Sequence, residues 1–332
     1  MKRKGSLIIL LFILVAGTLI VSSCGGTESA GESQGLKDIT VMLDWVPNTN
    51  HTGLYVAKEK GWFEEKGLNV EIVNASQAGA AQMVASGEVP FGVSYQEEVT
   101  MARSTGVPIV SIAAVIQHNT SGFASLKEDN IVSPKDFENK RYGGGATPAE
   151  EDVLQSLMAK YDADYSTVDF VNVGDADWFS IIGKEVDFTW IFYGWTGIEA
   201  ELRGLDINYI ELAKEDPALD YYTPVLITNE DMIKENPDTV KAFLEAVSKG
   251  YEYCIANPEE SAEILLAAAP ELDAELVKAS QEYLSGQYQA EASQWGIQKR
   301  EVWENYAQWL YDHQLIEEMI NVDAAFTNDF LP

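Results

Sequence analysis

The apolar positions along the chain form two alternating kinds of segment, short apolar runs and longer stretches with helical spacing. The run 39–43 is followed, after a polar turn, by a helical pattern over 52–60, which Gly61 ends. The segment 68–73 alternates apolar and polar positions, which is typical of a strand with one covered face. Strands that alternate with helices predict a mainly parallel sheet with helices on both faces.

This alternation continues to about residue 116 and then begins a second cycle. In the first cycle, the remaining predicted elements are a helix over 78–86, a strand over 91–93, a helix over 97–104 and a strand over 109–116. The second cycle opens with a strand near Tyr142, three glycines over 143–145, and a capping box of Thr147 and Glu150 that starts a helix. The elements predicted after that helix are strands over 168–173, 186–192 and 207–210, and helices over 178–183 and 195–202.

Two such cycles, followed by a largely helical tail, predict two α/β lobes. The chain is expected to cross between the lobes near 117–126 and to return near 222–228. Lobe one then holds residues 37–120 and 228–332, and lobe two holds residues 121–227. Ligands of such sheets bind beyond the carboxyl ends of the strands, so two facing lobes are expected to enclose a cleft there.

The first residues are typical of a targeting segment, which is not part of the folded protein. Positions 2–4 are basic, and an apolar run follows over 7–21, shorter than the roughly 20 residues that cross a membrane. The run ends in the letters VSSC, so small residues precede Cys24, which predicts a secretory signal peptide over 1–23. A Cys at this place resembles a bacterial lipobox, in which it carries the lipid; the alternative is a Cys that merely follows a signal peptide. Residues 24–36 are rich in Gly, Ser and Glu and predict a flexible tether.

Composition narrows the class of protein further. The chain of 332 residues has 22 Lys and Arg against 53 Asp and Glu, a net charge of -31. Nucleic-acid binding needs a basic face, so this balance argues against a nucleic-acid partner. The 8 Trp, 15 Tyr and 12 Phe are far too many for a disordered chain, and 2 Cys supply no disulfide framework.

Motifs that carry metal or cofactor chemistry are missing. No H-E-x-x-H or P-loop pattern occurs, and His51, His118 and His313 are not spaced for a shared metal ion. We therefore expect no metal site and no cofactor. The glycine run 143–145 lacks the last Gly of the dinucleotide fingerprint. It predicts either a tight strand-to-helix turn or a place where the backbone at Gly144 approaches a ligand closely.

Aromatic, amide and acidic side chains follow several of the predicted strands at the edge where a ligand is expected. Aromatic faces with a few polar groups suit a flat heterocycle. In chain order, the candidate ligand-binding residues are Asp44, Trp45, Asn48, Asn50, His51, Tyr95, Glu98, Gly144, Trp190, Tyr193, Trp195, Glu199 and Tyr222. Any one aromatic residue is more often part of a core than of a site, and Trp195 with Glu199 also fits an ordinary helix face.

Stacking and hydrogen bonding give these candidates distinct expected roles. A flat ring is expected between Trp45 of lobe one and Tyr193 or Trp195 of lobe two. The carboxylates of Glu98 and Glu199 can accept hydrogen bonds from an exocyclic amine. The amides of Asn48 and Asn50 can both donate and accept.

Several runs of the sequence resemble a known family. The runs 43–57 (LDWVPNTNHTGLYVA) and 60–68 (KGWFEEKGL) are similar to solute-binding proteins that serve the uptake of thiamine pyrimidine precursors. The shorter runs 92–97 (GVSYQE) and 193–195 (YGW) extend the resemblance. Altogether it covers essentially all of residues 38–315.

The resemblance implies a type II periplasmic-binding fold with a cleft between its lobes. It also implies an extracytoplasmic lipoprotein, monomeric and anchored to the cell membrane through Cys24, that delivers its ligand to an ABC permease and its ATPase. The implied ligand is a thiamine pyrimidine precursor such as formylaminopyrimidine, with riboflavin or another heterocycle as the alternative. Relatives that bind sulfonates fit less well, because acidic residues such as Glu97 and Glu199 would repel an anion.

One branch of the resembled family is an enzyme, which builds the thiamine pyrimidine from its own His and pyridoxal phosphate. In that branch a Lys and a His lie just after the third strand. This sequence has Ser94 and Glu98 in the corresponding stretch. We therefore expect no catalysis, and an extracytoplasmic enzyme is the less favoured alternative.

Overall fold

The computed structural model describes residues 35–145, 148–174 and 176–332. The predicted signal peptide, the lipobox residue Cys24, the tether up to residue 34 and the predicted N-cap Thr147 lie outside this part of the chain. From Leu36 to Pro332 the chain forms one structural unit, and this unit contains two five-stranded sheets.

The first sheet has the strand order β2-β1-β3-β10-β4. Its strands are β1 (Lys37–Met42), β2 (Leu68–Val73), β3 (Phe91–Ser94), β4 (Ile109–Ala114) and β10 (Val225–Asn229). Only β10 runs against the other four, so the sheet is mainly parallel, as predicted. Ile39 and Val41 pack into one core and Met42 into another, so the apolar run of β1 is covered on both faces.

The second sheet repeats this plan with the order β7-β6-β8-β5-β9. Its strands are β5 (Ser121–Leu126), β6 (Arg141–Gly144), β7 (Asp169–Asn172), β8 (Phe188–Phe192) and β9 (Ile207–Glu211). Here β5 is the antiparallel strand, paired with β8 on one side and β9 on the other. In each sheet, the one antiparallel strand directly follows, along the chain, a segment that connects the two sheets.

The connections differ from the prediction in two places. The segment 117–126 was expected to be a crossing, but its second half is the buried strand β5. Small residues such as Gly122 and Ala124 weaken the apolar pattern there. Position 122 has to be glycine, because a Cβ atom there would lie 2.3 Å from the Ile210 backbone oxygen. On the return path, β10 already begins at Val225 in the first sheet, three residues before the expected boundary at 228.

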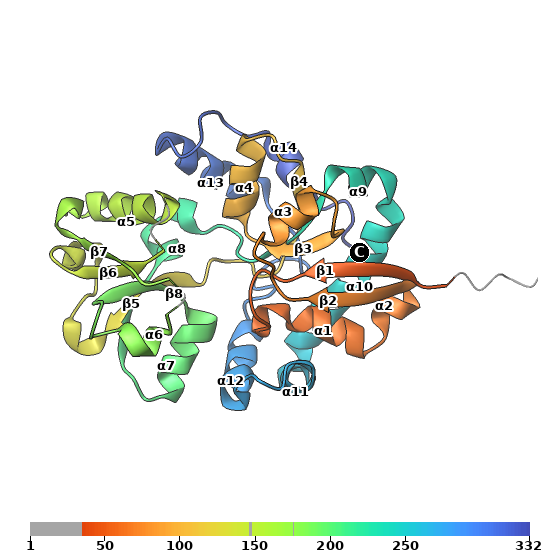
Figure 1. The fold of residues 1–332 in the computed structure, drawn as a ribbon, viewed down its shortest axis with the longest axis horizontal. Coiled ribbons are helices and arrows are strands. Elements are labelled where there is room, and N and C mark those ends of the chain that lie inside the picture. Colours follow the sequence, from red (N-terminus) through yellow and green to blue (C-terminus); the bar gives the residue numbers. More distant parts are fainter. Residues whose placement is uncertain (1–34, 146–147, 175) are drawn as a thin grey trace, which may run out of the picture. The chain divides into compact units, whose positions relative to one another are not determined.

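Helices cover both faces of each sheet. Figure 1 shows α3 and α4 on one face of the first sheet and α1, α2 and α10 on the other, while α5 covers one face of the second sheet and α6 and α7 the other. Up to the return connection, the helices are α1 (Thr52–Glu59), α2 (Trp62–Glu65), α3 (Ala80–Ala85), α4 (Gln96–Ser104), α5 (Pro148–Lys160), α6 (Trp178–Ile181), α7 (Ile198–Leu202) and α8 (Leu212–Glu215).

The tail beyond β10 is largely helical, as predicted, but it is interrupted over residues 286–299. Its helices are α9 (Glu230–Glu235), α10 (Pro237–Ala256), α11 (Pro258–Ala268), α12 (Ala274–Ser285), α13 (Arg300–Asp312) and α14 (Val322–Ala325). The interruption carries Trp295, which is buried and donates from its indole nitrogen to the Val115 backbone oxygen at 3.2 Å. Across the described residues, no helix is long and apolar enough to cross a membrane.

Helices α1 and α10 approach each other closely at two glycines. A Cβ atom on Gly250 would lie 2.1 Å from the backbone oxygen of Gly53, a separation that real Cβ atoms do not reach. The neighbouring Tyr251 stacks on Trp295 with ring centroids 4.4 Å apart, and its hydroxyl donates to the Asn50 backbone oxygen at 2.6 Å. The glycine contact therefore brings α10 close enough to hold the turn that precedes α1.

We predict that Gly250→Ala lowers the free energy of unfolding by about 1–3 kcal/mol, because the added methyl group forces α1 and α10 apart. Urea denaturation measures this change. Gly286→Ala is the matched control, since its Cβ would come no closer than 3.8 Å to the Tyr283 backbone oxygen. The control should stay within about 0.5 kcal/mol of the wild type. Equal stability of both variants would contradict the close helix contact.

Candidate functional site

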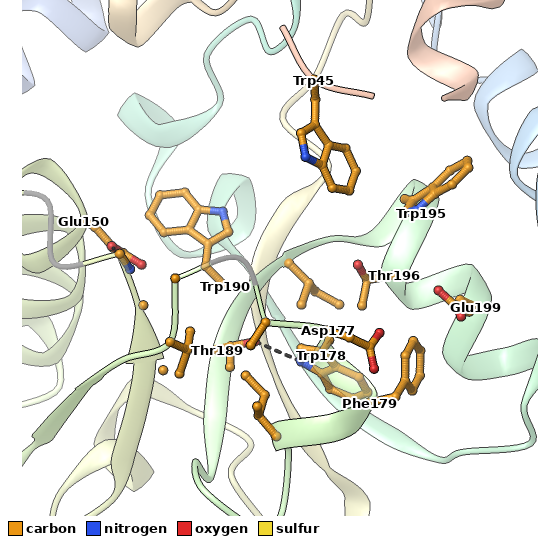
Figure 2. Close-up of a pocket in the computed structure, with 18 residues that line it drawn as sticks. Trp45, Glu150, Asp177, Trp178, Phe179, Thr189, Trp190, Trp195, Thr196 and Glu199 are labelled. Carbon is orange, nitrogen blue, oxygen red and sulfur yellow. Dashed lines mark hydrogen bonds between the residues drawn. The ribbon is translucent and has the colours of Figure 1, made fainter. Parts of the chain in front are cut away.

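Three adjoining cavities lie at the carboxyl ends of strands from both sheets, and Trp190 of β8 lines all three. Their volumes are about 500, 390 and 350 Å³. In Figure 2, Trp45, Trp190 and Trp195 surround the largest cavity, and Trp45 reaches toward it from the segment after β1. The two sheets therefore contribute to one cleft, at the edge where the strand order predicts it.

The cavity of about 350 Å³ is the asparagine chamber, which is formed where β1 and β3 face β8. It is lined on the side of the first sheet by Asp44, Trp45, Asn48, Asn50 and Tyr95, and on the other side by Trp190, Ile191, Phe192, Trp195 and Thr196. The chamber thus has aromatic walls from both sheets and a polar end at the asparagines. Trp45 is 55% exposed, which leaves its ring face available to a ligand.

Hydrogen bonds within the turn after β1 fix the polar end of the asparagine chamber. The Asn48 side chain caps the short helix Thr49–His51, accepting from the Asn50 backbone N–H at 2.9 Å and donating to the Val46 backbone oxygen at 3.0 Å. In return, His51 Nδ1 accepts from the Asn48 backbone N–H at 3.2 Å. This reciprocal cap leaves His51 Nε2 as the donor to Asp44 Oδ1, 2.7 Å away.

The cavity of about 500 Å³ is the glycine chamber, which lies against the turn after β6. Its main lining residues are Trp45, Gly143, Gly144, Gly145, Glu150, Asp177, Trp178, Phe179, Trp190, Trp195 and Glu199. A Cβ atom on Gly144 would lie 2.4 Å from Glu150 Oε1, so a larger residue there would displace this carboxylate. At this turn the Glu150 carboxylate accepts from the Gly145 N–H at 3.0 Å and from the Tyr142 hydroxyl. The close approach of a ligand to Gly144 stays a prediction.

The acidic residue Glu199 lines the glycine chamber together with Trp195, one turn earlier in the chain. Its carboxylate is already paired with Arg203, whose Nε donates to Oε1 at 2.9 Å. The same guanidinium lies over the Phe179 ring, 3.9 Å from its centroid. Arg203 therefore offsets the charge of Glu199, which makes this carboxylate a weaker acceptor for a ligand than the sequence suggests.

The cavity of about 390 Å³ is the tyrosine chamber, between α4, α5 and α13. Its lining residues are Tyr95, Glu97, Ala149, Glu150, Val153, Trp190, Phe192, Tyr221, Thr223 and Tyr306. Tyr221 and Tyr306 lie with ring centroids 4.3 Å apart. Two carboxylates, one from each side of the cleft, thus meet five aromatic rings in this chamber.

The electrostatic surroundings of Glu97 disfavour its charged form. Burial, together with the nearby carboxylates of Glu98 and Glu150, raises its pKa to about 7. Burial also raises the pKa of Glu98, with Asp44 adding to the effect, although the hydrogen bond from the Ser94 hydroxyl opposes it. Negative charge in the cleft is therefore poorly compensated around Glu97.

The cavities include nine of the thirteen ligand-binding candidates: Asp44, Trp45, Asn48, Asn50, Tyr95, Gly144, Trp190, Trp195 and Glu199. The other four lie outside the three chambers. His51 is fully buried with both ring nitrogens occupied, so it positions Asp44. Glu98 accepts from the Ser94 hydroxyl.

The two remaining tyrosines are held by packing away from the chambers. The Tyr193 ring packs against Tyr209 and Tyr283, with centroids 4.9 and 5.5 Å away. Of the two stacking partners predicted from lobe two, Trp195 therefore lines the cleft and Tyr193 does not. The buried Tyr222 accepts from the Lys299 backbone N–H at 2.8 Å through its hydroxyl, and its neighbour Tyr221 lines the cleft instead.

Several lining residues are not among the candidates from the sequence, chiefly Glu150, Asp177, Trp178, Phe179, Tyr221 and Tyr306. Glu97 was expected near the cleft as an acidic residue but was not named as a ligand contact. The sequence pattern assigns Glu150 to a helix capping box. Tyr306 lies in a predicted helix where the spacing of the aromatic residues indicates core packing only. The acidic pair Glu97 and Glu98 gave a signal, but helix geometry turns only the first toward the cleft. Within the described residues, no group of three or more His, Cys, Asp or Glu is placed to hold a metal ion.

The fold is that of the periplasmic binding proteins. The solved structure of the periplasmic aliphatic sulphonate-binding protein from Escherichia coli matches with a TM-score of 0.68 and 12% sequence identity, over 87% of this chain and 91% of that one. This likeness confirms the predicted fold class, two α/β lobes that each hold a mainly parallel sheet with flanking helices.

Sequence comparison identifies the family. A formylaminopyrimidine-binding protein from Halalkalibacterium halodurans is 32% identical over 95% of this chain and 97% of its own length. A 4-amino-5-hydroxymethyl-2-methylpyrimidine phosphate synthase from Legionella pneumophila is 26% identical over 89% of this chain and 92% of its own length. The pattern of the NMT1/THI5-like family matches residues 48–261. The chain belongs to the NMT1/THI5-like family, which confirms the resemblance found in its sequence.

We predict that Glu97→Gln stabilises the protein at high pH. The folded-state pKa of Glu97 is raised from the ordinary 4.5 to about 7, so ionising this group costs folding free energy as the pH rises through that window. At pH 8 the variant should gain about 1–3 kcal/mol in the free energy of unfolding. At pH 4.5 it should match the wild type, whose Glu97 is then largely protonated.

Urea denaturation at both pH values measures this effect. Glu301→Gln, an exposed carboxylate on α13, is the control and should change stability little at either pH. A Glu97→Gln effect that is the same at pH 4.5 and pH 8 would show that ionisation of Glu97 is not its cause.

Proposed function

We propose that the protein is the solute-binding component of an ABC importer and captures an aminopyrimidine, such as formylaminopyrimidine, in its cleft. The observation that carries this proposal is the chemistry of the cleft. The described residues that line the three chambers include five carboxylates and several aromatic rings, but no Lys, Arg or His. Such a surface accepts hydrogen bonds from ring amines and stacks on a flat ring.

The asparagine chamber supplies both kinds of contact to one ring. Trp45 and Trp195 offer aromatic faces from the two sides of the cleft, and each stacking contact contributes about 0.5–1.5 kcal/mol beyond area burial. The Asp44 carboxylate can accept from an exocyclic amine, for about 1.5–3 kcal/mol. The name of the Halalkalibacterium halodurans relative, which is similar over nearly the whole chain, supports a formylaminopyrimidine as the ligand.

The acidic cleft disfavours the anions bound by some proteins of the same fold. A sulfonate needs N–H or O–H donors or a cation around its oxygens. Here five carboxylates, Asp44, Glu97, Glu150, Asp177 and Glu199, line the chambers. Their field would repel a sulfonate, so a shared fold with sulphonate-binding proteins does not extend to a shared ligand.

Binding without catalysis fits the residues better than a synthase does. Ser94 ends β3 and donates to Glu98 one turn into α4, at the place where the synthase branch is expected to have Lys and His. Among the described residues that line the chambers there is also no Cys, so no strong nucleophile faces the ligand. We therefore propose that the bound pyrimidine leaves the cleft unchanged.

Substitution of Trp45 tests the aminopyrimidine site. We expect Trp45→Ala to weaken formylaminopyrimidine binding by about tenfold or more, because stacking area and the aromatic contact are both lost. The melting temperature of the unliganded variant should change little, since this side chain is 55% exposed. Isothermal titration calorimetry measures the affinity.

Tyr311→Ala is the control for Trp45→Ala, because Tyr311 is an aromatic residue, 43% exposed, outside the chambers. It should bind like the wild type. Wild-type protein that binds riboflavin but no aminopyrimidine would leave the receptor class intact and overturn the ligand. Unchanged affinity in Trp45→Ala would overturn the stacking role of Trp45.

We also propose that the protein works outside the cytoplasm as a monomer, held at the membrane by a lipid on Cys24 and docking on the permease of its importer. The motivation is the sequence VSSC after a short apolar run, followed by residues 24–36 as a tether. Two or more acyl chains give stable anchoring, where a single chain is marginal.

Cys24→Ala should move most of the protein from the membrane fraction to the soluble fraction, because the lipid attachment point is lost. Fractionation of cells that express each form, followed by immunoblotting, measures the distribution. Cys254→Ala removes the buried thiol and should leave the distribution unchanged. Equal membrane retention of Cys24→Ala and wild type would mean that Cys24 is not the anchor.

A further inference from the structure

Helix α12 contacts both walls of the asparagine chamber from outside the chamber. Figure 1 shows α12 between α7, which covers the second sheet, and α11, which packs against α1 of the first sheet. Its other neighbours are the short helical segments Thr49–His51 and Tyr193–Gly197, which follow β1 and β8. The helix therefore joins two segments that carry ligand-binding candidates beyond the ends of these strands.

A buried hydroxyl on α12 connects these two segments through a continuous chain of hydrogen bonds. The Ser280 hydroxyl donates to the Gly194 backbone oxygen. Its oxygen lies 2.6 Å from Thr49 Oγ1 and accepts from that hydroxyl, because the Ser280 proton is already donated to Gly194. Thr49 is 1% exposed and Ser280 is 0% exposed, so neither hydroxyl reaches solvent. These two hydrogen bonds form the α12 bridge.

At one end, the α12 bridge attaches to the asparagine turn, residues 45–50. Thr49 directly follows Asn48, which lines the asparagine chamber. The Asn48 side chain donates to the Val46 backbone oxygen at 3.0 Å and accepts from the Asn50 backbone N–H at 2.9 Å. The asparagine turn is therefore bonded within itself, and the α12 bridge sets its position relative to α12 at Thr49.

At the other end, the α12 bridge attaches to the segment that carries an aromatic wall of the cleft. Gly194 directly precedes Trp195, which lines both the asparagine and the glycine chamber. A Cβ atom on Gly194 would lie 2.9 Å from Leu284 Cδ2, so this backbone lies directly against α12. The Tyr193 ring packs on Tyr283 of the same helix, with centroids 5.5 Å apart. Contacts with α12 thus place the segment on which Trp195 lies.

Ser280 lines none of the three chambers, so it reaches the ligand-lining residues only through their neighbours in the chain. Loss of its hydroxyl would leave the Thr49 hydroxyl buried without its acceptor and would release the Gly194 oxygen from α12. A buried polar group without a partner is costly, and backbone movement or an entering water relieves that cost. Either change alters the separation of Asn48 from Trp195.

We infer that Ser280 is a positioning residue for ligand binding, because the α12 bridge fixes the separation between the asparagine turn and Trp195. The inference rests on the proposed function for the identity of the bound ring. It gives α12 the role of a support that both walls of the asparagine chamber share. Walls that are already at the right separation bind a ring without being reordered, which favours affinity.

A double-mutant cycle, measured by isothermal titration calorimetry with formylaminopyrimidine, tests the inference. Ser280→Ala should weaken binding by about fivefold or more in the otherwise unchanged protein. In the Trp195→Ala background the same substitution should change affinity by less than about twofold, because the wall that Ser280 positions is gone. Ser285→Ala is the control on α12, since the Ser285 hydroxyl donates to the nearby Glu282 backbone oxygen. This control should bind like the wild type.

A pair of substitutions at Thr49 separates the hydrogen bond from packing. Thr49→Val keeps the shape of the side chain but removes the hydroxyl, so it should weaken binding as Ser280→Ala does. Thr49→Ser keeps the hydroxyl and should bind within about twofold of the wild type. Urea denaturation checks that each variant is folded under the conditions of the titration.

Two results of these titrations would overturn the inference and leave the proposed function standing. One is a loss of affinity from Ser280→Ala that is equally large with and without Trp195, since Ser280 would then act on the fold in general. The other is wild-type affinity in both Ser280→Ala and Thr49→Val.

Crystal structures of the unliganded wild type and of Ser280→Ala measure the same geometry without a ligand. The distance between the backbones of Asn48 and Trp195 should differ between the two structures. An unchanged distance would overturn the inference. Wild-type protein that binds no aminopyrimidine would overturn the proposed function alone, because this structural comparison does not depend on the ligand.

Discussion

The hydrogen bond between the buried His51 and the partly exposed Asp44 fixes the first-sheet side of the cleft. His51 is fully buried, so each ring nitrogen needs a partner, and the Asn48 N–H and the Asp44 carboxylate at 2.7 Å supply them. Tyr288 extends this support by donating to the Thr49 backbone oxygen at 2.7 Å. Trp45, one residue after Asp44, therefore projects into the cleft from a rigid base although its own side chain is largely exposed.

The cleft holds more negative charge than a fold would keep for stability alone. Among its carboxylates, Glu199 has a cationic partner in Arg203, whereas Glu97 is surrounded by other acids and by tyrosines. A carboxyl group whose pKa is raised to about 7 costs folding free energy when it ionises near neutral pH.

The NMT1/THI5-like family includes relatives named as binding proteins and relatives named as synthases. Both kinds are similar to this chain over most of its length, at 32% and 26% identity. In this chain, the Ser94 hydroxyl donates to Glu98 just after β3.

The sequence by itself determined the alternation of strands and helices, the two lobes and the segment after β1, because apolar periodicity and local capping depend on near neighbours. It therefore predicted Trp45, Asn48 and Asn50, which lie directly after a strand. It did not separate Tyr221 from Tyr222 or Glu97 from Glu98. Each pair consists of two adjacent residues of the same type, and only tertiary packing decides which side chain of the pair points into the cleft. Tyr306 joins the cleft only because α13 folds back against α4, some 200 residues earlier in the chain. Tertiary structure decided this part of the site, because contacts between distant segments leave no local pattern.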